Sequence, residues 1–200
     1  NNKNNVKIIA VSKTFEISHI IPLIEYGHTD FGENKVQEAI QKWTNIKIKK
    51  NNLSIHLVGK LQSNKTKLAL KIFDYIHSLD SEKLANKISE EQKKIEKKPK
   101  LFIQVNIGNE VQKSGVDPHN LKSFYKYCLD KDLNVIGTMC LPPISTDPEK
   151  YCMRMNYLNK DLGLNELSMG MSADYISAIE CNATYIRVGS KIFGERTKKA

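Results

Sequence analysis

Lys13 is the residue of this sequence best placed for covalent chemistry. It closes the apolar, β-branched run that begins at Val6, and such a run predicts a strand buried on both faces. An α/β fold builds its binding site just beyond the carboxyl ends of its strands. Desolvation there lowers the pKa of an amine and makes it a nucleophile toward a carbonyl group. The alternative is a lysine that extends from the strand end into solvent.

The segment that follows Arg187 has the composition of a phosphate-binding turn. A predicted strand leads through Gly189 and Ser190 into a helix expected to start near Lys191. Free amides and the helix dipole favour a phosphate at such a helix start. Barrels often bind phosphate after strands seven and eight, and Ser168 ends the predicted seventh strand. An amine opposite a phosphate site fits a ligand that carries both an aldehyde and a phosphate, such as pyridoxal 5'-phosphate.

Eight strand–helix units position these residues. The predicted strands are 6–13, 29–31, 54–59, 75–78, 101–106, 134–139, 166–169 and 185–188, and the predicted helices are 16–26, 34–44, 64–73, 81–97, 118–130, 148–162, 173–181 and one from about 191. Strands that alternate with helices predict a parallel sheet. Eight such units in 200 residues favour an α/β fold with a single (β/α)8 TIM barrel over residues 1–200. An open doubly wound sheet is the alternative.

In a barrel, all strand ends meet on one face, so the residues there form a candidate site. The set is polar, and polar loops at strand ends explain part of it without any function. Neither GxGxxG after the first strand nor GxxxxGK[ST] occurs, so no dinucleotide or nucleoside triphosphate is indicated. The strand-end residues are Lys13, Glu33, Asn34, Gly59, Gln62, Ser63, Asn64, Ser78, Asp80, Asn106, Met139, Ser168, Met169, Arg187, Gly189 and Ser190.

Composition narrows the class of protein. The formal charge is +9, but lysines are mixed with acidic residues and asparagines, so we expect no specific nucleic-acid binding. The four cysteines lack metal-ligand spacing and are interpreted as reduced thiols in a cytoplasmic protein. No apolar stretch approaches the length of a membrane span, and the N-terminus lacks the apolar core of a signal peptide.

Six motifs, in order, resemble those of the pyridoxal phosphate homeostasis protein family, also called the proline synthase co-transcribed homologue family. They are Val11-Ser12-Lys13, Phe31-Gly32-Glu33-Asn34 with Val36-Gln37-Glu38, His56 to Lys65, Gln104-Val105-Asn106-Ile107 with Glu110 and Lys113-Ser114-Gly115, Leu167 to Ser172, and Arg187-Val188-Gly189 with Ile192-Phe193-Gly194. The resemblance runs from Val6 to Arg196 and implies a barrel like the N-terminal domain of alanine racemases.

The resemblance also implies a role for each candidate residue. Lys13 would form a Schiff base with the aldehyde of pyridoxal phosphate, and Asn34 would lie beside the hydroxyl side of its ring. Ser168, Gly189 and Ser190 would hold the phosphate. Arg187 would face the pyridine nitrogen, where a cation discourages protonation of the ring and weakens the cofactor as an electron sink.

The sequence departs from the family at a few positions. The helix that usually precedes the first strand is missing or shortened, Lys60 replaces a common proline, and Ala173 replaces an acidic residue. Asn182 stands where glycine is usual, which is a mild change because asparagine tolerates left-handed backbone angles. None of these positions is a proposed cofactor contact.

Two functions follow from the resemblance. The first is a monomeric carrier that takes part in cofactor homeostasis, without enzymatic turnover, and passes pyridoxal phosphate to apo-forms of dependent enzymes. The second is an amino-acid racemase or decarboxylase of the same barrel class. Those enzymes have an additional β-rich domain, which we do not expect in this chain because four residues follow Arg196. His56 and His77 are interpreted as structural residues. These considerations favour the carrier.

Overall fold

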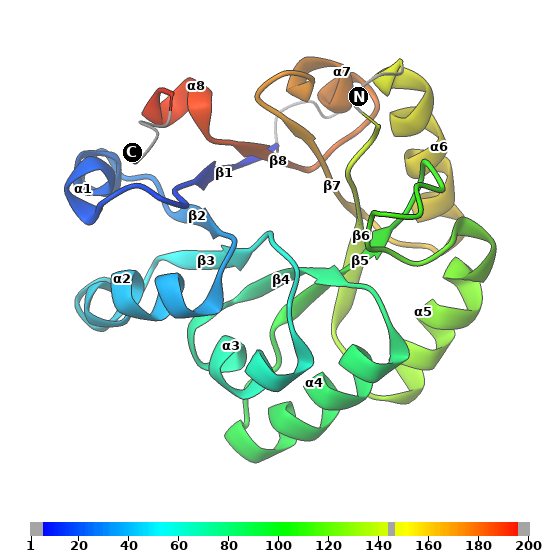
Figure 1. The fold of residues 1–200 in the computed structure, drawn as a ribbon, viewed down its shortest axis with the longest axis horizontal. Helices are drawn as coiled ribbons and strands as arrows, with labels where there is room; N and C mark the ends of the chain where they lie inside the picture. The colour runs from blue at the N-terminus through cyan, green and yellow to red at the C-terminus, as the bar shows by residue number, and fades with distance from the viewer. Residues whose placement is uncertain (1–5, 144–146, 196–200) are drawn as a thin grey trace.

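The computed structural model describes residues 6–143 and 147–195, which form a closed barrel of eight parallel strands in sequential order (Figure 1). The helices surround the barrel, and the predicted TIM-barrel fold is confirmed. The prediction of a single domain over residues 1–200 includes residues that lie outside the described ranges. The strands are β1 (Lys7–Val11), β2 (Asp30–Glu33), β3 (Ser54–Leu57), β4 (Tyr75–Leu79), β5 (Lys100–Val105), β6 (Val135–Cys140), β7 (Glu166–Met171) and β8 (Tyr185–Val188). The α-helices are α1 (Ile17–Glu25), α2 (Val36–Lys49), α3 (Thr66–Ile72), α4 (Glu82–Ile95), α5 (Leu121–Asp130), α6 (Pro148–Asp161), α7 (Tyr175–Glu180) and α8 (Ser190–Phe193), with short 3-10 turns at Ser63–Lys65 and Pro118–Asn120.

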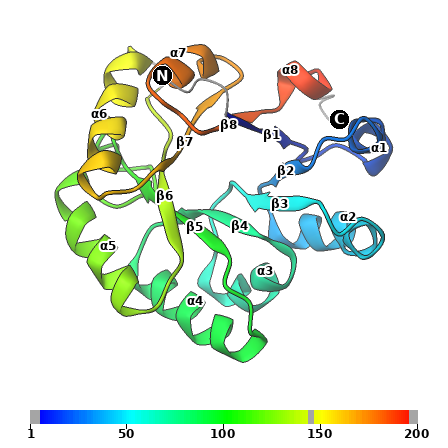
Figure 2. The same ribbon diagram turned by 180° about the vertical axis from the view of Figure 1, so that it is seen from behind.

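Strand β1 closes the barrel between β2 and β8. Ala10 pairs with Phe31 of β2 on one side, and Ile9 pairs with Arg187 of β8 on the other. The view from behind shows β1 and β8 side by side (Figure 2). Because all strands are parallel, their carboxyl ends share one rim of the barrel. The closure therefore brings Lys13, just after β1, to the part of the rim where β8 ends.

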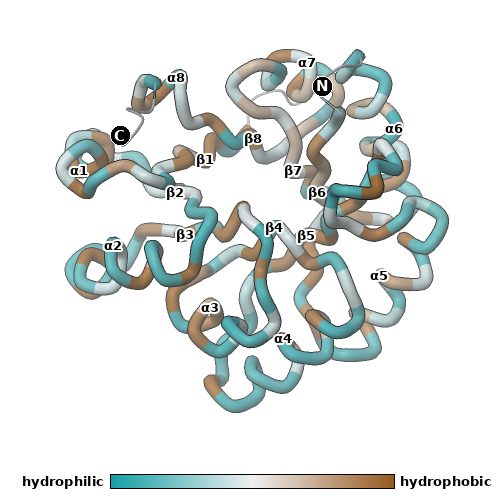
Figure 3. The backbone as a smooth tube through the Cα atoms, viewed as in Figure 1, coloured by the Kyte–Doolittle hydropathy of each residue, from teal (hydrophilic) through white to brown (hydrophobic). Residues whose placement is uncertain are grey.

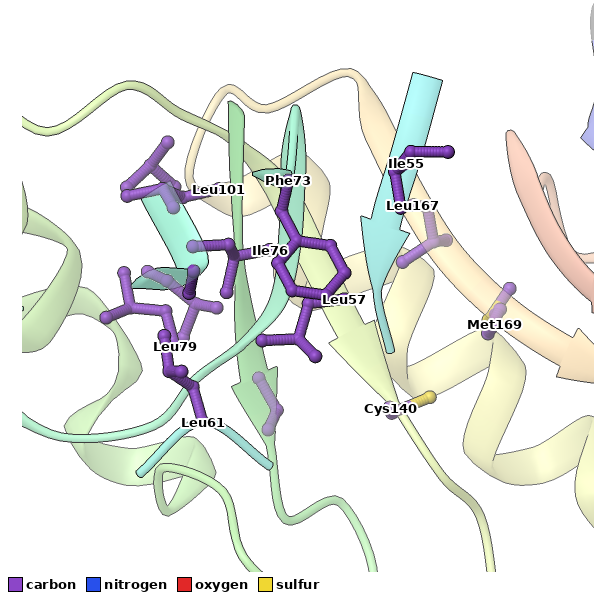
Figure 4. Packing of buried hydrophobic residues seen from close by; sticks show 14 of the residues in the cluster. Ile55, Leu57, Leu61, Phe73, Ile76, Leu79, Leu101, Cys140, Leu167 and Met169 are labelled. Atoms are coloured by element: carbon purple, nitrogen blue, oxygen red, sulfur yellow. The ribbon is translucent and has the colours of Figure 1, made fainter. Parts of the chain in front are cut away.

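The main hydrophobic core lies between the barrel and its helices. The strands are mostly apolar, whereas the outer faces of the helices are mostly hydrophilic (Figure 3). Leu57, Phe73 and Ile76 are fully buried in this core and lie close together (Figure 4). Burying a side chain of this size stabilises the fold by about 1.5–3 kcal/mol. This layer fixes the strands that carry the site.

The interior of the barrel is unusual in its composition. Branched aliphatic residues dominate the interior layers of typical TIM barrels. Here two imidazole rings stack on aromatic rings: His56 lies on Tyr75 with ring centroids 4.2 Å apart, and His77 lies on Phe102 at 4.3 Å. Tyr185 packs against both histidines and Phe102. The structural role predicted for the histidines is incomplete, because their ring nitrogens also form hydrogen bonds with side chains of other strands.

Several element ends differ from the predictions, and three of these differences bear on the site or its support. Helix α2 continues to Lys49, because its apolar spacing persists beyond Thr44. Strand β7 continues to Met171 rather than ending at Met169, although Gly170 and Met171 are not strand formers. Helix α8 is a single turn, so it supplies backbone amides but little helix dipole. Asn182 has φ +67°, which is the left-handed conformation that glycine usually provides.

Candidate functional site

A cavity of about 670 Å³ opens at the carboxyl rim of the barrel. It brings together Lys13, Asn34, Arg187, Gly189 and Ser190, which are five of the six predicted site residues. The other residues of its wall are Val11, Val58, Gly59, Lys60, Gln104, Gln112, Lys113, Ser114, Leu141, Met171, Ser172 and Ala173.

Helix α2 holds the backbone on both sides of Lys13. Lys42 donates from Nζ to the carbonyl oxygen of Ser12 at 2.9 Å, and Glu38 accepts the backbone N–H of Thr14 at 2.6 Å. Glu38 and Lys42 are one helical turn apart and also form an ion pair at 3.1 Å. Thr14 has φ +69°, an unfavourable angle for a β-branched residue. The chain therefore turns sharply after Lys13, and side-chain contacts to α2 stabilise that turn.

Glu33 is the buried anchor of this arrangement. Its side chain is 0% exposed and its Oε1 accepts bonds from Ser12 Oγ at 2.8 Å, Lys42 Nζ at 2.9 Å and Trp43 Nε1 at 3.0 Å. Burial raises the pKa of Glu33, while the Lys42 ammonium opposes that rise. A buried ion pair with several hydrogen bonds thus lies directly behind the strand end that carries Lys13.

Gly59 allows the end of β3 to approach the loop after β2. A Cβ atom at Gly59 would lie 2.4 Å from the backbone oxygen of Asn34, a distance that no side chain can tolerate. Asn34 is half-buried and lines the cavity next to Gly59. The glycine at the strand end therefore sets the position of Asn34, and we predicted both residues at this rim.

Arg187 is a buried cation in the wall of the cavity. It is 5% exposed, and it donates to Ser168 Oγ at 2.6 Å and to the carbonyl oxygen of Cys140 at 2.9 Å. Burial lowers the pKa of Arg187 from its ordinary value, but a guanidinium stays protonated in proteins. These two bonds fix the plane of the guanidinium at the rim of β8.

Ser168 is the predicted site residue that the structure does not bring to the cavity wall. Its hydroxyl is fully buried inside the barrel, between Arg187 and His77. Because β7 continues to Met171, the residue that reaches the cavity is Ser172, whose Oγ accepts the backbone N–H of Gly189 at 3.3 Å. Ser172 is the last residue of the motif that begins at Leu167, and we missed it because we ended the strand too early.

The loop from Asn106 to Val116 forms the opposite wall. The Asn106 side chain holds this loop, since it donates to the Glu110 carbonyl at 2.9 Å and accepts the Glu110 N–H at 3.1 Å. The loop contributes Lys113, which pairs with Glu110 and donates to the Leu141 carbonyl at 3.4 Å. Three lysines therefore line the cavity, namely Lys13, Lys60 and Lys113.

The chemistry of the wall fits a phosphorylated aldehyde. An amine at Lys13, hydroxyls at Ser172 and Ser190, and a guanidinium at Arg187 face one space. A Cβ atom at Gly189 would lie 3.3 Å from the Val11 carbonyl oxygen, so glycine allows the end of β8 to lie close against β1. Among the described residues, the wall includes no carboxylate, imidazole, phenol or thiol.

The cysteines lie away from the wall. All four are buried and unbonded to one another. Burial raises the pKa of Cys128, Cys140 and Cys152 to about 12, so these thiols stay protonated and unreactive at neutral pH.

In residues 6–143 and 147–195, no helix combines the length and apolar character needed to span a bilayer.

Comparisons with known proteins identify the family of this chain. A family model described as the N-terminal domain of alanine racemase matches residues 2–197. The chain is 36% identical to the pyridoxal phosphate homeostasis protein of Haemophilus influenzae, over 98% of this chain and 87% of that protein. It is 37% identical to the homeostasis protein of Aquifex aeolicus, over 97% and 89% of the two chains.

Solved structures extend the comparison. PipY of Synechococcus elongatus, solved with pyridoxal phosphate bound, superposes with a TM-score of 0.87 at 35% identity, covering 96% of this chain and 93% of that one. An alanine racemase of Clostridium difficile has a TM-score of 0.74 at 15% identity, covering 98% of this chain and 54% of that one, and shares the fold alone. The chain therefore belongs to the pyridoxal phosphate homeostasis protein family, and its barrel has the fold of the alanine racemase N-terminal domain.

Proposed function

We propose that this protein binds pyridoxal 5'-phosphate in the rim cavity, as a Schiff base on Lys13, and takes part in cofactor homeostasis by buffering and supplying it. The observation that carries the proposal is one cavity whose wall contains Lys13 together with Ser172, Gly189 and Ser190. The bound pyridoxal phosphate of PipY, a relative of the same family, supports the choice of ligand.

Each candidate site residue in the wall then has a role in binding the cofactor. Lys13 supplies the amine for the reversible covalent bond, and Asn34 lies beside the hydroxyl side of the ring. Gly189, Ser190 and Ser172 hold the phosphate, with the two serine hydroxyls as donors. The predicted phosphate contact of Ser168 stays a prediction, since its hydroxyl lies below the wall.

Arg187 limits what the bound cofactor can do. Pyridoxal phosphate supplies an electrophilic aldehyde and an electron-withdrawing ring. A guanidinium that faces the ring nitrogen keeps that nitrogen unprotonated and so restrains carbanion chemistry. The described part of the wall also lacks a histidine, tyrosine or carboxylate that could exchange a proton with a bound amino acid. We therefore propose a carrier rather than a racemase or decarboxylase.

We infer that apo-forms of pyridoxal-phosphate-dependent enzymes receive the cofactor, and that the carrier is a monomer that acts in the cytoplasm. The test uses the loaded protein and an apo-enzyme. The control reaction supplies the apo-enzyme with the same concentration of free cofactor, released slowly. Faster recovery of enzyme activity with the loaded protein than in this control supports the carrier. Sustained racemisation or decarboxylation of amino acids by the loaded protein alone, at enzyme-like rates, contradicts it.

A further inference from the structure

A continuous chain of side-chain hydrogen bonds runs through the barrel interior from the amino end of β2 to the cavity. Asp30 Oδ1 lies 3.0 Å from His56 Nε2, and His56 Nδ1 lies 3.0 Å from His77 Nε2. His77 Nδ1 lies 2.9 Å from Ser168 Oγ, which accepts from Arg187 at 2.6 Å. The five residues come from five different strands, so the chain of hydrogen bonds links β2, β3, β4, β7 and β8 across the barrel interior.

The two ends of this chain determine its direction. An ionised carboxylate only accepts hydrogen bonds, and a guanidinium only donates them. Asp30 therefore requires a proton on His56 Nε2, which leaves Nδ1 of neutral His56 as an acceptor. His77 then donates from Nε2 and accepts at Nδ1, so the Ser168 hydroxyl donates to His77. Every donor points from Arg187 toward Asp30, and the Ser168 oxygen is left free to accept from Arg187.

The surroundings keep both imidazoles neutral. Burial lowers the pKa of His56, which Asp30 opposes, and lowers the pKa of His77 well below its ordinary value. The titratable groups that face His56 are Asp30 on β2, Tyr75 on β4 and Tyr185 on β8, with Lys7 and Asp74 acting through space. Those that face His77 are His56, Tyr185 and Arg187, while Phe102 covers its ring. Burial alone would raise the pKa of Asp30, but its bonds to His56 and Thr29 lower it.

Arg187 needs this support because it is a buried cation without a direct ion pair. Within the described residues, no carboxylate lies within 4 Å of its guanidinium. A hydroxyl that already donates its proton to another group is a stronger hydrogen-bond acceptor than an isolated hydroxyl, because hydrogen bonds in a chain polarise one another. The Asp30 carboxylate is the negative end of that chain.

We propose that a directional relay of positioning residues fixes Arg187 at the cavity. The relay consists of Asp30, His56, His77 and Ser168. Through it, a carboxylate at the amino end of the barrel controls the contact between Arg187 and the ring nitrogen of the cofactor. The part of this inference that concerns the bound cofactor rests on the proposed function. The relay itself is a property of the unloaded protein and is tested there first.

The first experiment measures imidazole tautomers by two-dimensional 15N NMR on the unloaded protein, whose five histidines make assignment simple. We expect His56 and His77 both to be protonated at Nε2 at pH 8 and to stay neutral to a lower pH than a free imidazole. In Asp30→Asn, the amide can donate or accept, so both histidines should populate the other tautomer. A wild-type His77 protonated at Nδ1, or a variant that changes His56 alone, would overturn the relay.

The second experiment follows the absorption of bound pyridoxal phosphate against pH. We expect Asp30→Asn and Ser168→Ala each to shift the midpoint of the spectral titration by several tenths of a pH unit, and Asp30→Asn to have no further effect in an Arg187→Gln background. Asp74→Asn is the matched control, because Asp74 acts on His56 only through space. An equal shift of the titration midpoint in that control overturns the relay. Failure of the wild type to bind the cofactor refutes the proposed function, but the relay can still be tested by the tautomer experiment on the unloaded protein.

Discussion

Lys42 Nζ lies 2.9 Å from the carbonyl oxygen of Ser12, the residue directly before Lys13. The helix that follows β2 thus reaches back to the end of β1 and holds the backbone from which the Lys13 side chain extends. On the other side of Lys13, Glu38 holds the N–H of Thr14. The position of the amine in the cavity therefore depends on two charged residues of α2 that do not line the cavity themselves.

Replacing Thr14 by glycine tests the strain in this turn. Thr14 has φ +69°, and a left-handed angle costs an L-residue about 1–2 kcal/mol, although glycine loses part of this gain through its more flexible unfolded state. We expect Thr14→Gly to leave the free energy of unfolding unchanged or to raise it by up to about 1 kcal/mol. Thr44→Gly, within α2, should lower it. Denaturant unfolding of both variants measures the effect, and a loss of stability in Thr14→Gly would refute the strain.

Removing Lys42 tests the buried ion pair. Lys42→Met leaves the fully buried Glu33 carboxylate without its cation, and breaking such a pair costs about 3–5 kcal/mol. The pKa of Glu33, already raised by burial, should rise further, so the stability deficit of the variant relative to the wild type should shrink as the pH falls from 7.5 to 5 and Glu33 binds a proton. Lys98→Met removes only the exposed partner of Asp132 and should change stability little. Equal losses in the two variants would contradict this account.

The buried histidines predict a loss of stability in acid. The folded-state pKa of both His56 and His77 lies below the unfolded value near 6.5. The unfolded chain therefore binds protons first as the pH falls below about 6.5, and stability declines by up to about 1.4 kcal/mol per pH unit for each histidine. Denaturant unfolding at pH 7.5 and pH 5 should show this decline, and His77→Gln should reduce it. The same decline in the variant would remove His77 as a cause.

The proposed phosphate contacts predict a specific loss of cofactor retention. Ser172 and Ser190 line the cavity around Gly189. A hydrogen bond to a charged group contributes about 1.5–3 kcal/mol, so the double variant Ser172→Ala with Ser190→Ala should lose pyridoxal phosphate at least about tenfold faster. Binding of pyridoxal, which lacks the phosphate, should change much less. If both ligands weaken equally, the serines do not hold the phosphate.

Much of the fold could be predicted because parallel strands buried on both faces are continuous apolar runs bounded by glycine, proline and polar residues. Lys13 and Arg187 were identified because each stands at the end of such a run. Ser168 and Ser172 could not be told apart, since Gly170 and Met171 carry no strand signal and the end of β7 depends on pairing with β8. Register decides which side chains point inward.

The relay could not be predicted for the same reason. His56, His77 and Ser168 lie up to 112 residues apart in the chain, and their ring nitrogens and hydroxyl meet only when the barrel closes. A histidine in an apolar run is usually structural, and nothing local distinguishes one that bonds across the barrel. Three-dimensional pairing is the information that the sequence pattern lacks.

The central claim, that Lys13 is a reversible covalent tether, is tested most directly by borohydride reduction of the protein loaded with pyridoxal phosphate, followed by peptide mapping. Lys60 and Lys113 line the same cavity and are the internal controls. The account predicts a permanent adduct on Lys13 and loss of the visible absorption band in Lys13→Ala. An adduct on Lys60 or Lys113 instead, or no adduct at all, would contradict it.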